Sequence, residues 1–427
     1  MFETGSMKRS AMSGVGAVAL VLGGLGAGIC LTAPTASAAE AKPAYSKPFI
    51  TAAGPLQTAL AAIKGKTPDA AAIEGLKHQL DGVLAAASTA DDQLAVGGMA
   101  VNIGGMAKDE ALQRKGVTLM LASGKATGEL VPKLHFFAGQ FAYNAKEYPL
   151  AISELQTALT GNPQNYDAAA LLSDSYIRNN QAALGLGVLQ QTIGKMKAAG
   201  AAVPENWYRT GLGGAYRAKL LDQALGFSTD LVTAYPSKQN WAAAISAVRD
   251  VAHYPSQEAL DLMRLMGRTN SYSESRDYIE YIQSADPRRL PGEVLSVINA
   301  GAVSGMLKMS DPFVVEAKGM ANGRLVADKA SLPGLERDAR SGTATTAMGA
   351  GDAFLSYGDP VKAAELYTLA LGKPGVDVSR ALTRLGIAQL DKGDIASAQA
   401  NFAKVTGVRQ PLARLWSIYA SQKAAGK

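Results

Sequence analysis

The feature that most constrains this chain is a set of small and aromatic residues that recurs every 35 positions near its C-terminus. The matched pairs are Gly351 and Gly386, Gly358 and Gly393, Ala363 and Ala398, and Tyr367 and Phe402. A fixed period of this length is typical of an array in which each unit buries its apolar face against the next. The recurring glycine and alanine are small enough for two helices to touch, and we expect the aromatic positions to fill the seam to the next hairpin.

The same copies predict how each hairpin turns. A Gly-Asp step stands at 358–359 and again at 393–394. Glycine tolerates the left-handed backbone that ends a helix, and aspartate accepts hydrogen bonds from the free amides that begin the next one. Each step therefore predicts the end of a first helix and the start of a second.

An earlier set of residues has a related period. Ala151 and Ala224 are 73 residues apart, and so are Pro163 and Pro236. This spacing equals two repeat lengths plus a short insertion near 198–203. Two independent anchors at one spacing indicate further copies of the same hairpin.

These residues follow the pattern W-x2-L-G-x2-Y…A-x3-F…P, and the chain resembles tetratricopeptide (TPR) repeat proteins over about residues 131–236 and 344–424. The resemblance implies an all-α fold, a right-handed α-solenoid of TPR-like helical hairpins. It also implies that a concave surface, lined by the first helix of each hairpin, binds a protein or peptide segment.

Composition agrees with a helical chain, because 48% of residues are hydrophobic but only 6% are aromatic, and alanine and glycine supply much of the rest. Thr67-Pro68 predicts a helix start with threonine as cap, and Pro333-Gly334 and Ser341-Gly342 predict loops. We divide the chain into five parts: a signal peptide (1–38), an Ala-rich helical region of degenerate repeats or a cap (39–130), TPR-like repeats (131–236), divergent helical hairpins (237–343), and C-terminal TPR repeats with a capping helix (344–427).

The first 38 residues have the three parts of a secretory signal peptide. Lys8 and Arg9 precede an apolar stretch over 15–31, and Ala36-Ser37-Ala38 supplies a small-residue cleavage site. We expect a periplasmic or secreted protein; the alternative is an uncleaved N-terminal membrane anchor, although several glycines weaken that helix. Cys30 is the only cysteine, so cleavage excludes disulfides, a thiol nucleophile and Cys-ligated metal.

No motif predicts catalysis, a cofactor or a metal. The stretch 349–354 resembles the Gly-Ala-Gly-Asp anion hole of ribokinase-like sugar kinases, but the chain lacks the strands of that fold. The histidines at 78, 135 and 253 are isolated, and Asp277 and Glu280 fit a solvated helix face. The formal charge of +6, mixed with acids, argues against nucleic acid.

By repeat phase, seven residues fall on the expected concave face: Gln140, Tyr143, Asn144, Arg178, Arg209, Tyr216 and Arg217. Tyrosine and arginine combine broad contact with directional hydrogen bonding, as recognition surfaces require. The sequence thus predicts a non-catalytic interaction scaffold or adaptor of the cell envelope. The alternatives are a helical protein or enzyme that binds an envelope polymer (glycan or peptidoglycan), and a structural self-assembling protein; the partner and the oligomeric state stay open.

Overall fold

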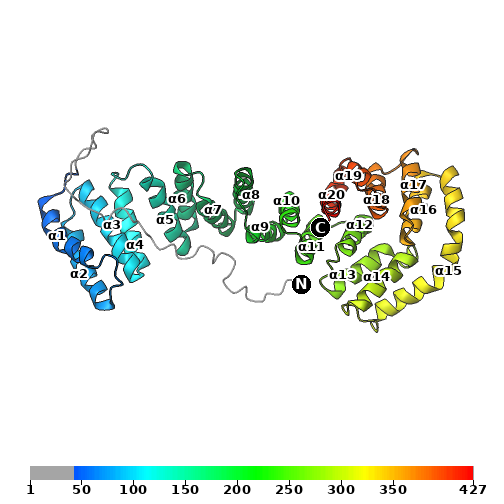
Figure 1. The fold of residues 1–427 in the computed structure, drawn as a ribbon, viewed down its shortest axis with the longest axis horizontal. Helices are drawn as coiled ribbons and strands as arrows, with labels where there is room; N and C mark the ends of the chain where they lie inside the picture. Colours follow the sequence, from blue (N-terminus) through cyan, green and yellow to red (C-terminus); the bar gives the residue numbers. More distant parts are fainter. Residues whose placement is uncertain (1–42, 427) are drawn as a thin grey trace. The chain divides into compact units, whose positions relative to one another are not determined.

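The computed structural model describes residues 43–426, which contain helices and no strand (Figure 1). The expected all-α class is confirmed, and successive helices pair into hairpins; the right-handed TPR-like solenoid stays a prediction. The predicted signal peptide and Cys30 lie outside the described residues. The chain forms two compact units that divide between Val203 and Pro204; the five-part division drawn from the sequence stays a prediction.

Unit 1 consists of four helical hairpins, in which each helix packs against the one before it. Their helices are α1 (Lys47–Ala62), α2 (Ala70–Ala86), α3 (Ala90–Ala107), α4 (Glu110–Ala122), α5 (Leu130–Asn144), α6 (Tyr148–Gly161), α7 (Tyr166–Arg178) and α8 (Ala182–Ala198). Asp92 joins the beginnings of α1 and α3, since its carboxylate accepts hydrogen bonds from the backbone amides of Ser46, Ser88 and Thr89. Burial alone would raise the pKa of Asp92, but these amides outweigh it and lower the pKa to about 2.

Unit 2 continues the pattern of hairpins and adds one long helix. Its elements are α9 (Glu205–Arg217), α10 (Leu221–Ala234), α11 (Lys238–Ala252), α12 (Ser256–Arg268), α13 (Ser275–Ala285), α14 (Pro291–Val303), α15 (Pro312–Ser341), α16 (Ala344–Ser356), α17 (Pro360–Leu371), α18 (Val378–Asp391), α19 (Ile395–Phe402), the 3-10 helix η1 (Gly407–Arg409) and α20 (Gln410–Ala424).

The 73-residue spacing is the length of two hairpins in the backbone itself. Adding 73 to the bounds of α6 gives the bounds of α10, and α7 and α8 map in the same way onto α11 and α12 within a few residues. The turn residues with left-handed backbone have the same spacing of 73. Lys146 and Lys219 have φ of 62° and 55°, and Asn180 and His253 have φ of 60° and 50°. The 73-residue period of the sequence therefore corresponds to a pair of hairpins that occurs twice.

The recurring glycines mark the closest contacts within the hairpins. A Cβ added at Gly351 would lie 2.6 Å from the Tyr367 ring, and one added at Gly386 would lie 2.5 Å from the Phe402 ring. Gly211 against Phe227 and Gly139 against Leu155 repeat the contact, and in all four cases the partner lies 16 positions later. The large residue thus packs on the glycine of its own hairpin. Phe402 also reaches the next helix, where its ring stacks on Trp416 with 6.0 Å between the ring centres, as expected of a residue that fills the seam.

The predicted turns are confirmed. Gly358 and Gly393 have φ of 79° and 92°, a conformation that L side chains rarely adopt. Asp359 and Asp394 then cap α17 and α19 by accepting from the amides of Lys362 and Ser397, at 3.0 and 3.2 Å.

Two local predictions were wrong. Asp69, and not Thr67, caps α2, because the Asp69 carboxylate accepts from the Ala72 amide at 2.8 Å. Pro333-Gly334 lies inside α15 instead of forming a loop. That helix packs on α14 and on α16, and these contacts outweigh the hydrogen bond that one proline removes. Gly342 does end the helix, as predicted.

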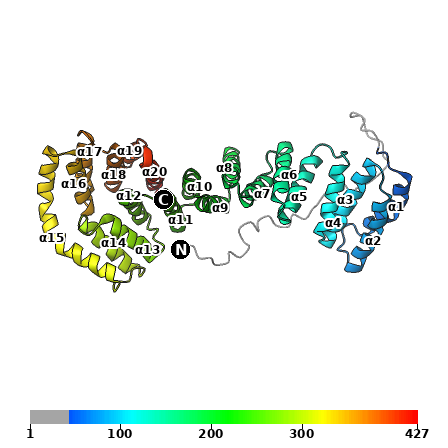
Figure 2. The same cartoon turned by 180° about the vertical axis from the view of Figure 1, so that it is seen from behind.

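The last helices of unit 2 return to its first ones, so that this unit closes on itself. Figure 1 and Figure 2 both show α20 beside α10 and α12. The Gln422 amide donates to the Val232 carbonyl at 2.7 Å, and Arg268 of α12 pairs with Asp391 of α18 at 2.6 Å. One hydrophobic core spans both ends of the unit, from Trp241 to Trp416. The expected open inner curve is therefore filled between α12 and α18.

We predict opposite effects of alanine at two glycines of α16. Gly351→Ala should lower the free energy of unfolding by about 1–3 kcal/mol, because the new methyl group overpacks the Tyr367 ring. Gly349→Ala, at an exposed position with nothing within 4 Å, should raise it by up to about 1 kcal/mol through helix propensity. All three tryptophans lie in unit 2, so urea unfolding followed by their fluorescence measures both changes. Equal urea midpoints for the two variants would show that the contact between Gly351 and the Tyr367 ring leaves room for a methyl group.

Candidate functional site

The predicted concave residues of unit 1 come together around Asp174. Tyr143 of α5 donates its hydroxyl to the Asp174 carboxylate on α7, and Arg178 donates to the same carboxylate at 2.6 Å. The Arg178 guanidinium also lies 5.5 Å from the centre of the Tyr143 ring. Burial and the Asp174 carboxylate raise the pKa of Tyr143 to about 12, so the phenol stays protonated and donates at neutral pH.

The other two unit 1 candidates lie beside this cluster on α5. Asn144 is exposed and donates to Glu110 of α4 at 3.1 Å, and Gln140 is half-buried one turn earlier. The face therefore consists of polar groups that already tie neighbouring helices together, with Asn144 and Arg178 open to solvent.

In unit 2 the predicted residues all lie on α9. Arg209 pairs with Glu205 at 2.8 Å, and Arg217 is exposed at the end of the helix. Tyr216, which stands 73 positions after Tyr143, donates to Asp250 of α11 at 3.3 Å. Tyrosines at equivalent positions thus hydrogen-bond an aspartate on the next first helix in each unit.

The hydrogen bond between Tyr216 and Asp250 is part of a longer chain of polar contacts. Arg249, next to Asp250 on α11, donates to Asp250 at 2.9 Å and pairs with Glu280 of α13 at 2.6 Å. Three successive first helices, α9, α11 and α13, are connected in this way. The order is Tyr216, Asp250, Arg249 and Glu280.

A cavity of about 300 Å³ opens beside these residues. Its walls come from the end of α11, the turn that follows, the first half of α12, and α13. The lining residues are Arg249, Asp250, His253, Tyr254, Ser256, Ala259, Met263, Glu280, Gln283 and Ser284. Most of these side chains are polar or charged, and Ala259 and Met263 are the two aliphatic residues among them.

Sequence reasoning missed most of this cavity and assigned Asp277 wrongly. Asp277 is 1% exposed and is not part of a solvated face. Its carboxylate accepts from the Ser273 and Glu274 amides at the start of α13, because those amides have no partner within the helix. Among the residues assigned to binding, Tyr216, which stands 73 positions after Tyr143, pointed to this part of the chain; His253 and Glu280 were noted in the sequence but were not assigned to a site.

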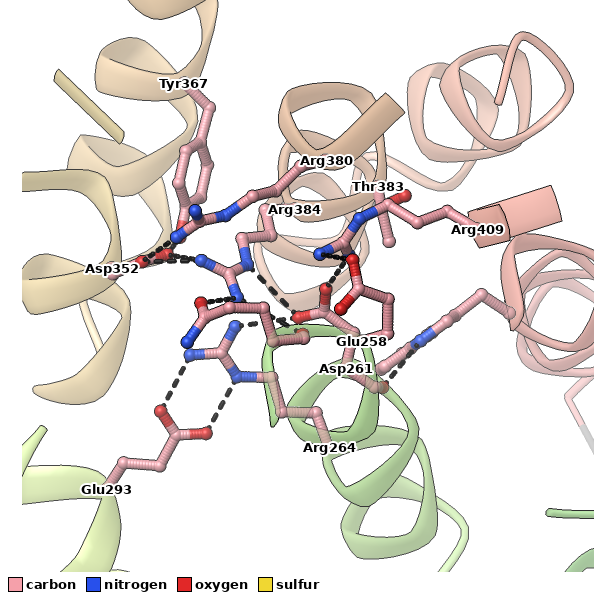
Figure 3. A network of polar contacts seen from close by, with 12 residues as sticks. Glu258, Asp261, Arg264, Glu293, Asp352, Tyr367, Arg380, Thr383, Arg384 and Arg409 are labelled. Atoms are coloured by element: carbon pink, nitrogen blue, oxygen red, sulfur yellow. Dashed lines mark hydrogen bonds and ion pairs between the residues drawn. The ribbon is translucent and has the colours of Figure 1, made fainter. Parts of the chain in front are cut away.

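The densest group of charges in the described chain is buried at the closure of unit 2 (Figure 3). Asp261 of α12 accepts from Arg264 at 3.2 Å, from Arg384 of α18 at 3.2 Å, and from Arg409 of η1 at 2.5 Å. All four side chains are at most 1% exposed. Asp261 is therefore the shared acceptor that joins α12 to α18 and η1.

Three further carboxylates complete the group, and one of them, Glu258 of α12, pairs with Arg409 at 2.9 Å. Glu293 of α14 accepts hydrogen bonds from Nε and Nη2 of Arg264, both at 2.8 Å, and Asp352 of α16 accepts from Arg384 at 2.6 Å. Burial alone would raise the pKa of Asp261 and of Glu293, but the arginine charges outweigh it and hold both pKa values below their usual range. These carboxylates are therefore ionised acceptors that hold helices together.

Asp352 belongs to the motif that resembles a kinase anion hole. It lies within α16 and accepts from the Tyr367 hydroxyl at 2.8 Å as well as from Arg384. In the structure Asp352 therefore serves as the acidic partner in a buried ion pair.

The three histidines belong to separate elements: His78 lies on α2, His135 lies on α5, and His253 follows α11. His78 and His253 are exposed on different units, and the His135 ring contacts Glu154 at 2.7 Å. Within residues 43–426 no three histidine, cysteine or acidic side chains gather as metal ligands do. Over the same residues no helix combines the length and apolar character that crossing a bilayer requires.

No family model matches the chain, and no curated protein matches it. Among solved structures, one described as Naa15/Naa10 bound to HypK-THB matches at 12% identity and a TM-score of 0.30, covering 87% of this chain and 67% of that one. A second, the APC/C hetero-tetramer Cut9-Hcn1, matches at 13% identity and a TM-score of 0.20, covering 88% and 84%. Because both TM-scores are low, the description of the fold depends only on the helices given above.

We predict that Asp261→Asn destabilises unit 2 by about 3–5 kcal/mol, because it leaves buried arginines without their shared counter-charge. Asp338→Asn, at an exposed position on α15, is the matched control and should stay within about 0.5 kcal/mol of the parent. Urea unfolding followed by tryptophan fluorescence reports the difference. An unchanged midpoint in Asp261→Asn would show that the network does not hold the unit closed.

Proposed function

We propose that this chain is a non-catalytic interaction scaffold or adaptor of the cell envelope, which holds a protein or peptide segment on the polar face of its first helices. The observation that carries the proposal is the linked set Tyr216, Asp250, Arg249 and Glu280, which crosses three successive first helices beside a cavity. An extended segment laid across these helices would meet hydrogen-bonding groups from each of them.

The state of the buried acids supports binding over catalysis. A general acid needs a carboxyl whose pKa is raised towards neutrality. Asp261 and Glu293 have lowered pKa values instead, because arginines surround them. These groups stabilise the scaffold on which the face is built.

One observation favours a second candidate function. Asp250 and Glu280 are both carboxylates that line the same cavity, as the acids of a glycan-binding protein or enzyme would. Arg249 pairs with both of them, which makes them positioned acceptors for a polar ligand. A glycan or peptidoglycan fragment is therefore the alternative occupant.

We expect a photoreactive amino acid at Asn144 or Arg217 to capture a partner protein in intact cells. Both positions are exposed at the ends of first helices, whereas Thr157 and Asp222 are exposed on the second helices α6 and α10 and serve as matched controls. Mass spectrometry of the products should find one protein enriched at the first pair and absent from the controls. Equal capture at all four positions, or none, would contradict the proposed face; attached saccharide would favour the alternative.

We expect the exported protein to begin at Ala39. The basic pair Lys8-Arg9, the apolar stretch and the Ala36-Ser37-Ala38 site together support cleavage and release into the periplasm or medium. Intact-mass analysis of the protein purified from the envelope fraction measures this directly. A mass that includes the apolar stretch, with the protein held in membranes, would instead indicate the N-terminal anchor.

A further inference from the structure

The cavity between α11, α12 and α13 has a charge balance that selects its ligand. Three carboxylates, Asp250, Asp277 and Glu280, surround the Arg249 guanidinium at 2.9, 3.5 and 2.6 Å. Arg276 pairs with Glu280 from the other side at 2.7 Å. Of these groups Asp250, Glu280 and Arg249 line the cavity. Their two negative charges and one positive charge leave a formal charge of −1, so an incoming cation is favoured over an anion.

The carboxylates at the cavity can still accept hydrogen bonds. The side chains of Asp250 and Glu280 are 27% and 24% exposed, and an ionised carboxylate offers about four acceptor sites, of which each uses about two here. Arg249 is only 11% exposed and is surrounded by these acids. It therefore orients the acceptors and is poorly placed to bind an anionic ligand.

The remaining walls suit an aliphatic stem. Ala259 of α12 and Tyr254 line the cavity and are partly exposed, whereas Met263 lines it but is fully buried. Lysine and arginine bury their methylene groups on apolar surface while the charged end contacts acceptors, and an aromatic ring attracts the same cation. At about 300 Å³ the space lies at the low end of ligand pockets and suits one side chain.

We propose that this cavity is an anchor pocket for one basic side chain, lysine or arginine, of the bound partner segment, an inference that rests on the proposed function. The charged end contacts Asp250 and Glu280, and the methylene stem lies on Ala259 and Tyr254. Because Tyr216 hydrogen-bonds Asp250, the pocket is continuous with the polar face on α9.

Two pairs of short peptides test the chemistry on the full mature chain. Acetyl-Gly-Gly-Arg-Gly-Gly-amide is compared with its citrulline analogue, and the lysine peptide with its norleucine analogue, by calorimetry or NMR titration. Each cationic peptide should bind at least about tenfold more tightly than its neutral partner, and added salt should reduce the difference. Equal binding within both pairs, or no binding of either cationic peptide, would overturn the proposal.

Variants of the protein locate the binding. Asp250→Asn and Glu280→Gln should each weaken the cationic peptides about tenfold, whereas Glu316→Gln, at an exposed acid on α15, should leave them unchanged. Ala259→Leu fills the cavity without altering its charge and should abolish the preference for the cation. This variant keeps the test valid if either charge variant unfolds, which far-UV circular dichroism detects. Unchanged affinity in folded Ala259→Leu would place the binding elsewhere.

The two proposals fail differently. If a photoreactive residue at Arg217 captures the partner equally in the parent and in Glu280→Gln, the pocket is wrong while the scaffold function stands. If the cationic peptides bind as expected but no partner is captured from Arg217, the proposed function fails while the pocket stands.

Discussion

The close approach of two helices at a glycine is the constraint on which the rest of this structure depends. At Gly139, Gly211, Gly351 and Gly386 the residue 16 positions later lies where a Cβ would stand. An aromatic or leucine side chain can reach the backbone of its own first helix only if that helix carries no side chain there. This contact sets the separation within a hairpin in both units, and it recurs because each hairpin must present the same apolar edge to the next.

Much of this fold could be predicted because its signals are local. Glycine, aspartate and the aromatic residue stand within one hairpin, so a fixed spacing along the chain reports their contact directly. The same logic explains why the turn residues at Gly358 and Gly393 were found, and why the 73-residue spacing matched the length of two hairpins. The loop predicted at Pro333 was wrong because packing on α14 and α16 decided that segment, and neighbouring residues do not record such contacts.

The buried charges could not be predicted, because their partners are distant along the chain. Arg384 and Arg409 reach Asp261 across 123 and 148 residues, and each alone looks like an ordinary surface charge on an amphipathic helix. The candidate site shows the same difference between local features, which could be predicted, and contacts between distant residues, which could not. Repeat phase placed Tyr143, Arg178 and Tyr216 on the first helices, but it could not reveal that Asp174 and Asp250 accept from the tyrosines. Arg249 was missed, and Glu280 was assigned to a solvated face, because the two stand on different helices and nothing along the chain records their ion pair.

The closure of unit 2 and the cavity share one helix, and this connects the stability of the unit to the proposed binding. On α12, Asp261 and Arg264 face the buried network, whereas Ala259 and Met263 line the cavity. The arginines that hold α12 against α18 and η1 therefore also fix one wall of the pocket. A binding wall held in this way loses little conformational freedom when a side chain enters, so more of the contact energy remains available for affinity. A buried ionic network gives less stability than an apolar core of equal size. Its charged partners must nevertheless meet in one arrangement, and that arrangement places α12 beside α11 and α13.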